Sequence, residues 1–103
     1  MSVLYITEFA AVGGASNFPV SAAQQLPLAE QVVTIGAGSL ASSAFNANTT
    51  LVRLHCDASS ACSFEFGASP TATALKARLS ANQTEYFSVP PNSGWKVAVI
   101  QNS

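Results

Sequence analysis

The sequence of 103 residues is long enough for one domain. Hydrophobic residues make up 49% of it and charged residues only 9%, whereas roughly a quarter of a typical soluble domain is charged. Such a sparsely charged surface protects poorly against association, so the composition favours a protein that works within an assembly. The four basic and five acidic side chains form no basic cluster, which argues against nucleic-acid binding.

The sequence also gives no sign of a membrane segment or a leader. No apolar run approaches the roughly 20 residues that a membrane-spanning helix needs. The first residues, Met1–Tyr5, have no positive segment ahead of an apolar one, and Glu8 follows soon after, which is not the pattern of a signal peptide. We therefore expect no membrane partner and synthesis in a cytoplasm, where disulfides are rare.

In chain order, the first expected strand is Val3–Phe9. Residues 10–28 follow, with Pro19, Pro27 and a glycine pair, and they have the composition of a loop or an extended arm. A connection of this length is unusual in a compact domain and is often functional. Its spaced apolar side chains are the candidate partner contacts: Phe18, Val20, Leu26 and Leu28.

Two interpretations of this arm remain open. The prolines hold the backbone extended, and an extended segment with spaced apolar side chains can lie along a neighbour's groove or sheet edge. In the second interpretation, the segment folds back over its own domain and closes the core.

The clearest pattern lies in the middle of the chain. After a β-branched strand at Gln31–Ile35 and an ambiguous Gly36–Ser43, residues Leu51–Cys56 alternate, and Cys62–Phe66 alternate again. The five turn-prone residues between these two runs predict a β-hairpin.

The alternation suggests a register for this hairpin. If Cys56 lies opposite Cys62, one face pairs Arg53 with Glu65 and His55 with Ser63. The other face is wholly apolar and comprises Val52, Leu54, Phe64 and Phe66.

Three more strands complete the expected set: Leu75–Leu79, Thr84–Val89 and Trp95–Gln101. About seven strands separated by turns predict an all-β fold, a single-domain antiparallel β-sandwich or jelly roll. This domain is expected to cover residues 1–103, with the loop or arm at 10–28.

The residue types that catalysis requires are scarce. His55 is the only histidine and lies on the charged face of the predicted hairpin, whereas a hydrolytic triad needs a histidine between a carboxylate and a nucleophile. Zinc takes about four ligands, and His55 with Cys56 and Cys62 offers three at most. We therefore expect no enzymatic activity, no metal and no cofactor.

The two cysteines allow two states. Opposed across a hairpin, Cys56 and Cys62 have a geometry that permits a disulfide, although the short loop gives it a modest entropic gain. The alternative is two reduced thiols that pack as small buried hydrophobes. The aromatic residues likewise allow a sugar-binding platform of Tyr5, Tyr86 and Trp95, or core and interface anchors.

Several segments, taken in order, carry a family resemblance: Ala44–Asn46, Thr50–Leu54, Phe66–Thr73, Arg78–Asn82, Glu85–Phe87 and Trp95–Ile100. They resemble a group of small structural proteins of tailed bacteriophages, over roughly residues 30–101. The resemblance implies a capsid cement or decoration protein on the virion surface, made in the host bacterial cytoplasm. Its partners would be the major capsid protein and copies of itself, as a homo-oligomer. The alternatives are a head–tail or tail accessory protein and a carbohydrate-binding module of a virion appendage.

Overall fold

The computed structural model describes residues 2–10, 12–15, 18–23 and 28–102, with only the backbone of 12–15 and 18–23. Every regular element in these residues is a β-strand, so the expected all-β fold is confirmed. No helix in this part of the chain is long and apolar enough to cross a membrane.

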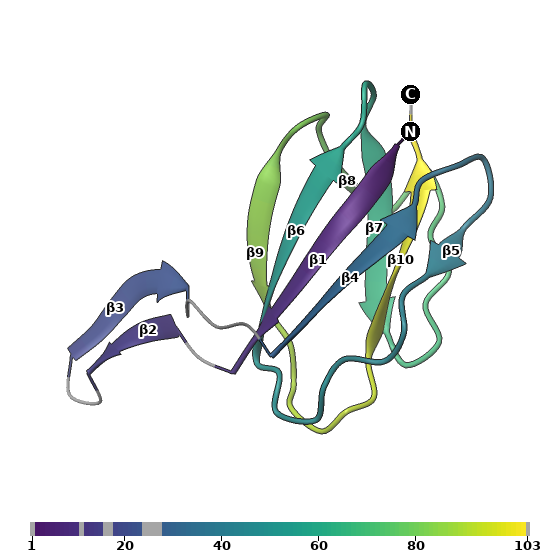
Figure 1. Ribbon diagram of the computed structural model, residues 1–103. Coiled ribbons are helices and arrows are strands. Elements are labelled where there is room, and N and C mark those ends of the chain that lie inside the picture. Colours follow the sequence, from purple (N-terminus) through teal and green to yellow (C-terminus); the bar gives the residue numbers. More distant parts are fainter. Residues whose placement is uncertain (1, 11, 16–17, 24–27, 103) are drawn as a thin grey trace.

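Eight of the strands form two four-stranded antiparallel sheets that pack face to face (Figure 1). The front sheet of Figure 1 contains, in spatial order, β4 (Ala29–Thr34), β1 (Val3–Phe9), β6 (Leu51–Asp57) and β9 (Thr84–Ser88). The back sheet contains β5 (Leu40–Ala41), β10 (Lys96–Gln101), β7 (Cys62–Gly67) and β8 (Ala77–Leu79). This arrangement is a β-sandwich. The connections follow a jelly roll only if β1 is counted as the last strand instead of the first, so the jelly-roll order is not confirmed.

The core lies between the two sheets, where alternate side chains of each strand point inward. Its largest fully buried apolar members are Leu4, Ile6, Val52, Leu54, Leu79, Val97 and Val99. Aromatic rings complete it, with Phe64 and Phe87 at a centroid distance of 5.2 Å and Phe66 and Phe87 at 5.4 Å. Each large apolar side chain removed from water contributes roughly 1.5–3 kcal/mol, so this layer is the main source of stability.

The predicted hairpin between β6 and β7 is wrong. The two strands lie in different sheets, so residues 58–61 connect one sheet to the other instead of turning within one. As expected, Val52, Leu54 and Phe64 are buried and Phe66 is partly buried. The apolar sides of β6 and β7 belong to the same core cluster and face each other across the sandwich. A hairpin and a connection between two sheets give the same alternation of apolar and polar residues, so the pattern alone could not distinguish them.

The predicted cross-strand pairs fail for the same reason. Arg53 lies opposite Thr7 and Tyr86 within the front sheet. In the back sheet, Glu65 lies opposite Ala98 and forms an ion pair of 2.7 Å with Lys76.

His55 and Ser63 are separated in the same way. His55 lies opposite Tyr5 and Thr84 in the front sheet, and Ser63 lies opposite Ile100 and Arg78 in the back sheet.

The segment expected to be a loop or extended arm contains a further hairpin. Strands β2 (Val12–Ala15) and β3 (Phe18–Ala23) pair antiparallel, with a register shift between Gly13 and Gly14. Figure 1 shows this hairpin standing outside the two-sheet body, beyond the end of β1. We call it the β2–β3 arm.

Candidate interaction surface

The β2–β3 arm accounts for only part of the predicted contact set. Phe18 and Val20 belong to β3, but their side chains are not described, and Leu26 lies outside the described residues. Leu28 is half-buried, and its backbone N–H donates to the carbonyl of Glu8 at 2.7 Å. Leu28 therefore belongs to the foot of the arm, where the chain rejoins the sandwich.

A buried carboxylate sits at this foot. Glu8 is only 1% exposed, and its Oε1 accepts hydrogen bonds from the backbone N–H of Asn46 at 2.7 Å and the hydroxyl of Thr49 at 2.8 Å. Its Oε2 accepts from Nε2 of Gln31 at 2.9 Å. Buried carboxylates are tolerated when donors satisfy them, and hydrogen bonds to a charged acceptor are among the stronger ones.

These bonds tie three parts of the chain together at the foot. Glu8 is on β1, Gln31 is on β4, and Oε1 of Gln31 accepts in turn from the backbone N–H of Ser43 at 2.9 Å. Because the arm leaves the body after β1 and returns before β4, the network fixes both of its attachment points. Glu8 is a functional residue that the expectations from the sequence did not include. The available signal was its position, since Glu8 continues the inward series Leu4 and Ile6 of a predicted strand.

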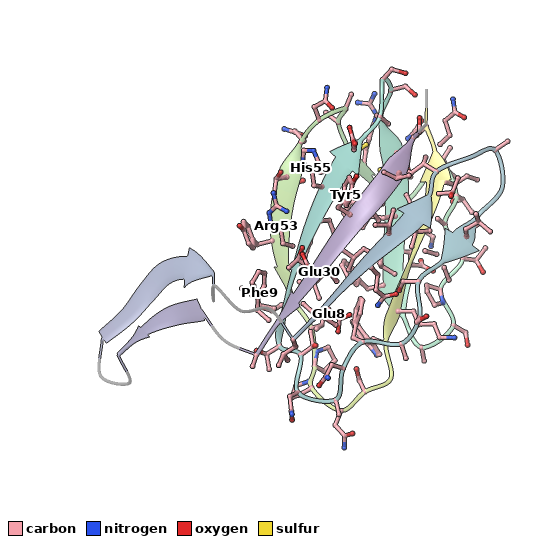
Figure 2. All side chains as sticks on the ribbon, viewed as in Figure 1. Tyr5, Glu8, Phe9, Glu30, Arg53 and His55 are labelled. Carbon is pink, nitrogen blue, oxygen red and sulfur yellow. The ribbon has the colours of Figure 1, made fainter. Side chains whose placement is uncertain are left out.

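The outer face of the front sheet carries exposed apolar side chains. Tyr5 is 42% exposed, Val32 58% and Tyr86 52%, and all three point away from the core. Tyr5 lies between Val32 on β4 and His55 on β6, with a centroid distance of 6.5 Å between the Tyr5 and His55 rings. Figure 2 looks onto this surface and shows Tyr5, His55, Arg53 and Glu30 together on it. We call it the front face.

A second row of the front face carries charge. Thr7 lies between Glu30 on β4 and Arg53 on β6, and Tyr86 on β9 lies beyond Arg53. In the part of the chain that the structure describes, the one ion pair joins Glu65 to Lys76, so Glu30 and Arg53 are not ion-paired there. The face thus carries exposed Val32, Tyr5 and Tyr86 together with one acidic and one basic side chain, Glu30 and Arg53, on either side of Thr7.

The middle of the outer face of the back sheet is covered by the chain itself, whereas Arg78 on the edge strand β8 is exposed. Ser63 and Ala98 point outward from their strands, yet both are fully buried. The connection from β7 to β8 lies over them. It is held by hydrogen bonds from the N–H of Ala72 to Oγ of Ser39 at 2.9 Å and from Nδ2 of Asn102 to the carbonyl of Ala74 at 3.4 Å.

Both cysteines are buried free thiols at the point where the chain crosses between the sheets. Desolvation, reinforced by the charge and side-chain hydrogen bond of Cys56, raises the pKa of Cys62 to about 12. A thiol in this environment stays protonated at neutral pH and is a poor nucleophile or metal ligand.

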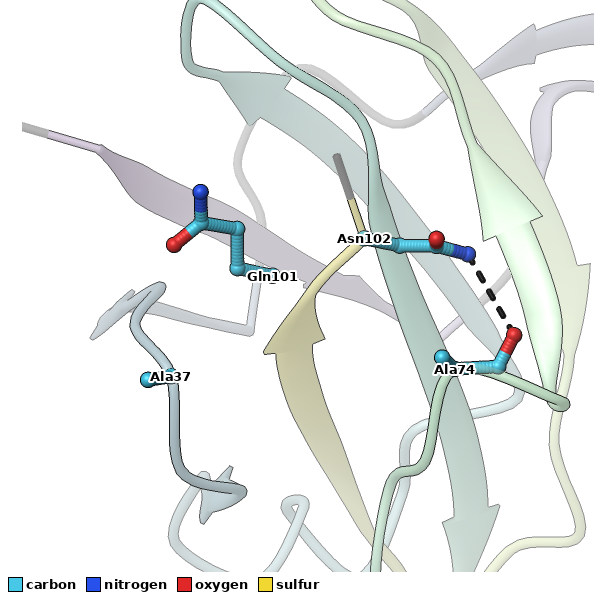
Figure 3. A pocket seen from close by; sticks show the side chains of 4 residues that line it. All are labelled: Ala37, Ala74, Gln101 and Asn102. Carbon is cyan, nitrogen blue, oxygen red and sulfur yellow. Dashed lines mark hydrogen bonds between the residues drawn. The ribbon is translucent and has the colours of Figure 1, made fainter.

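The remaining candidates do not form a site. No cluster of three or more metal-ligating side chains occurs in the described residues. Figure 3 shows a shallow hollow that contains no ionisable group and is lined by Ala37, Ala74, Gln101 and Asn102. Trp95 packs against the core, so it does not join Tyr5 and Tyr86 in a sugar-binding platform.

Comparisons with known proteins add no relative. No family model, no curated protein and no solved structure matched the chain.

Proposed function

We propose that this chain is a structural protein of a tailed-phage virion that cements or decorates the capsid by binding the major capsid protein through its β2–β3 arm. The observation that carries the proposal is the arm itself, a hairpin that stands outside the sandwich (Figure 1). A hairpin presents backbone donors and acceptors along its edges, and these can extend a sheet in a neighbouring subunit.

The foot of the arm supports this role. A projecting hairpin can hold its domain on a partner only if its two attachment points keep a fixed position in the domain. Here Glu8 on β1 accepts hydrogen bonds from Gln31 on β4, from Asn46 and, fully buried, from Thr49. Gln31 in turn accepts from the backbone N–H of Ser43. The arm is therefore attached to a base that these hydrogen bonds hold in place.

Removal of the arm tests the proposal. Because Glu8 pairs with Ala29 in the register of β1 and β4, a short Gly/Ser turn replacing residues 11–27 joins the strands without altering their pairing. We expect this variant to fold cooperatively with the melting temperature of the full chain within a few degrees, and to lose binding to phage heads. The measurement is co-sedimentation with heads that lack this chain.

A matched variant separates contact from folding. Replacing Phe18 and Val20 by Ser keeps the length of the arm but removes two of its apolar side chains, so it should weaken binding without lowering the melting temperature. A shortened chain that unfolds would mean that the segment covers its own core. A shortened chain that folds and binds heads normally would exclude the arm from binding.

A further inference from the structure

We propose that the front face is a self-association surface on which a second copy of this chain docks, related by a two-fold axis parallel to β1. This inference goes beyond the proposed function by naming the surface through which copies of the protein would meet. It does not depend on the arm or on the capsid.

The outer faces of the two sheets differ in how much of their surface is exposed. In the described residues, the outward Ser63 and Ala98 of the back sheet are fully buried, whereas Tyr5 and Val32 on the front sheet are 42% and 58% exposed. Tyrosine and arginine, which this face carries at Tyr5 and Arg53, are enriched in protein interfaces. An uncovered sheet face that carries them is suited to packing against another sheet, at a spacing of about 10 Å.

Charge complementarity of the front face with itself identifies a second copy of this chain as the partner. A two-fold axis along β1, between two front faces, places β1 over β1 and β4 of each copy over β6 of the other. Since Glu30 and Arg53 lie in one row on either side of Thr7, this operation puts Glu30 of one copy over Arg53 of the second, and the reverse. The face is therefore complementary to itself, as a two-fold interface requires.

Other orientations lose this match. Within one copy, Glu30 and Arg53 are separated by two strand spacings, about 10 Å, and the described residues give them no ion pair. An axis across the strands would place β6 over β6, so that Arg53 would face the second copy's Arg53 or His55. The axis along β1 satisfies both charges and also stacks Tyr5 on Tyr5 at its centre.

Charge reversal tests the pairing in the full-length chain. Sedimentation velocity up to about 0.5 mM should show a concentration-dependent dimer. Arg53→Glu or Glu30→Arg alone should weaken it at least tenfold, because each places like charges together. The double variant E30R/R53E restores opposite charges and should return the affinity to within about threefold. The control, Arg78→Glu on β8 of the back sheet, should leave the affinity unchanged.

Cross-linking gives a second measurement that does not depend on charge. Thr7→Cys lies on the proposed axis and should cross-link to itself through a short bis-maleimide, whereas Thr84→Cys on the edge strand β9 should not. A chain that stays monomeric overturns the inference, and so does a dimer that withstands the single reversals or is not rescued by the double one. The armless variant should still dimerise, so loss of head binding and loss of the dimer report separately on the two proposals.

Discussion

The two outer faces of the sandwich, each formed by four strands, differ in how far the rest of the chain covers their outward side chains. On the back sheet, the connection from β7 to β8 lies over the strands, so that Ser63 and Ala98 are fully buried although they point outward. On the front sheet, Tyr5 and Val32 occupy equivalent outward positions and remain exposed. Strand alternation therefore does not determine whether an outward side chain meets water. The path of the connecting segments does, and here it leaves Tyr5 and Val32 uncovered.

The largest expected effect is on the free energy of unfolding, when a negative charge is introduced first on the covered face and then, in a second variant, on the open face. Ala72→Asp buries a carboxylate beneath the back sheet's cover, where Ala72 is 2% exposed, and should lower the free energy of unfolding by about 3 kcal/mol. Val32→Asp on the open front face should cost about 1 kcal/mol or less. Urea denaturation of both variants measures the difference, and equal losses would mean that the faces are not distinct.

The interior between the faces responds to alkaline pH. The pKa of Cys62 rises from 9.0 to about 12 in the fold, so as the pH increases the unfolded chain loses this proton first. The thiol's contribution to stability is complete below about pH 9 and is lost as the pH rises towards 12. The free energy of unfolding of Cys62→Ala, measured over the same range, should fall less steeply than that of the unchanged protein. Parallel curves for the two proteins would contradict the burial of this thiol.

The smallest effect belongs to the ion pair at the edge of the covered face. The pKa of Glu65 is lowered, first by its hydrogen bond with Lys76 and then by the backbone N–H of Thr71. The contribution of this carboxylate is therefore present above its ordinary pKa of 4.5 and is lost as the pH falls through the lower folded value. Because the pair is exposed, Lys76→Ala should barely change the melting temperature at pH 7, with or without added salt. A clear drop would place the pair beneath the cover.

The sequence predicted single strands well and their neighbours badly. Val3–Phe9 forms a strand with the expected bounds, and the inward side chains Val52, Leu54 and Phe64 are buried, because alternation reports burial directly. Alternation could not predict which strands pair with β6, since its two neighbours, β1 and β9, lie far from it in the chain.

The candidate site was predicted in part. Glycines and prolines marked residues 10–28 as a loop or an extended arm, but they did not predict the strand pairing within it. The front face was missed. It arises only when Glu30, Thr7 and Arg53, which come from three separate strands, are aligned by the register. Such a row has no signature in the linear sequence.

The order of strands in the two sheets also bears on how the chain folds. In the sandwich, β7 and β8 are the only pair of hydrogen-bonded neighbours that are also consecutive in the described chain. The inner strands β1 and β10 come from opposite ends of that chain, and each must find partners many residues away. Proteins dominated by such distant contacts fold in milliseconds to seconds, far more slowly than helical bundles. Until β1 and β6 have paired, the apolar side of β6 is exposed to the solvent. The slow pairing of distant strands is therefore also the stage of folding at which chains are most prone to misassemble with one another.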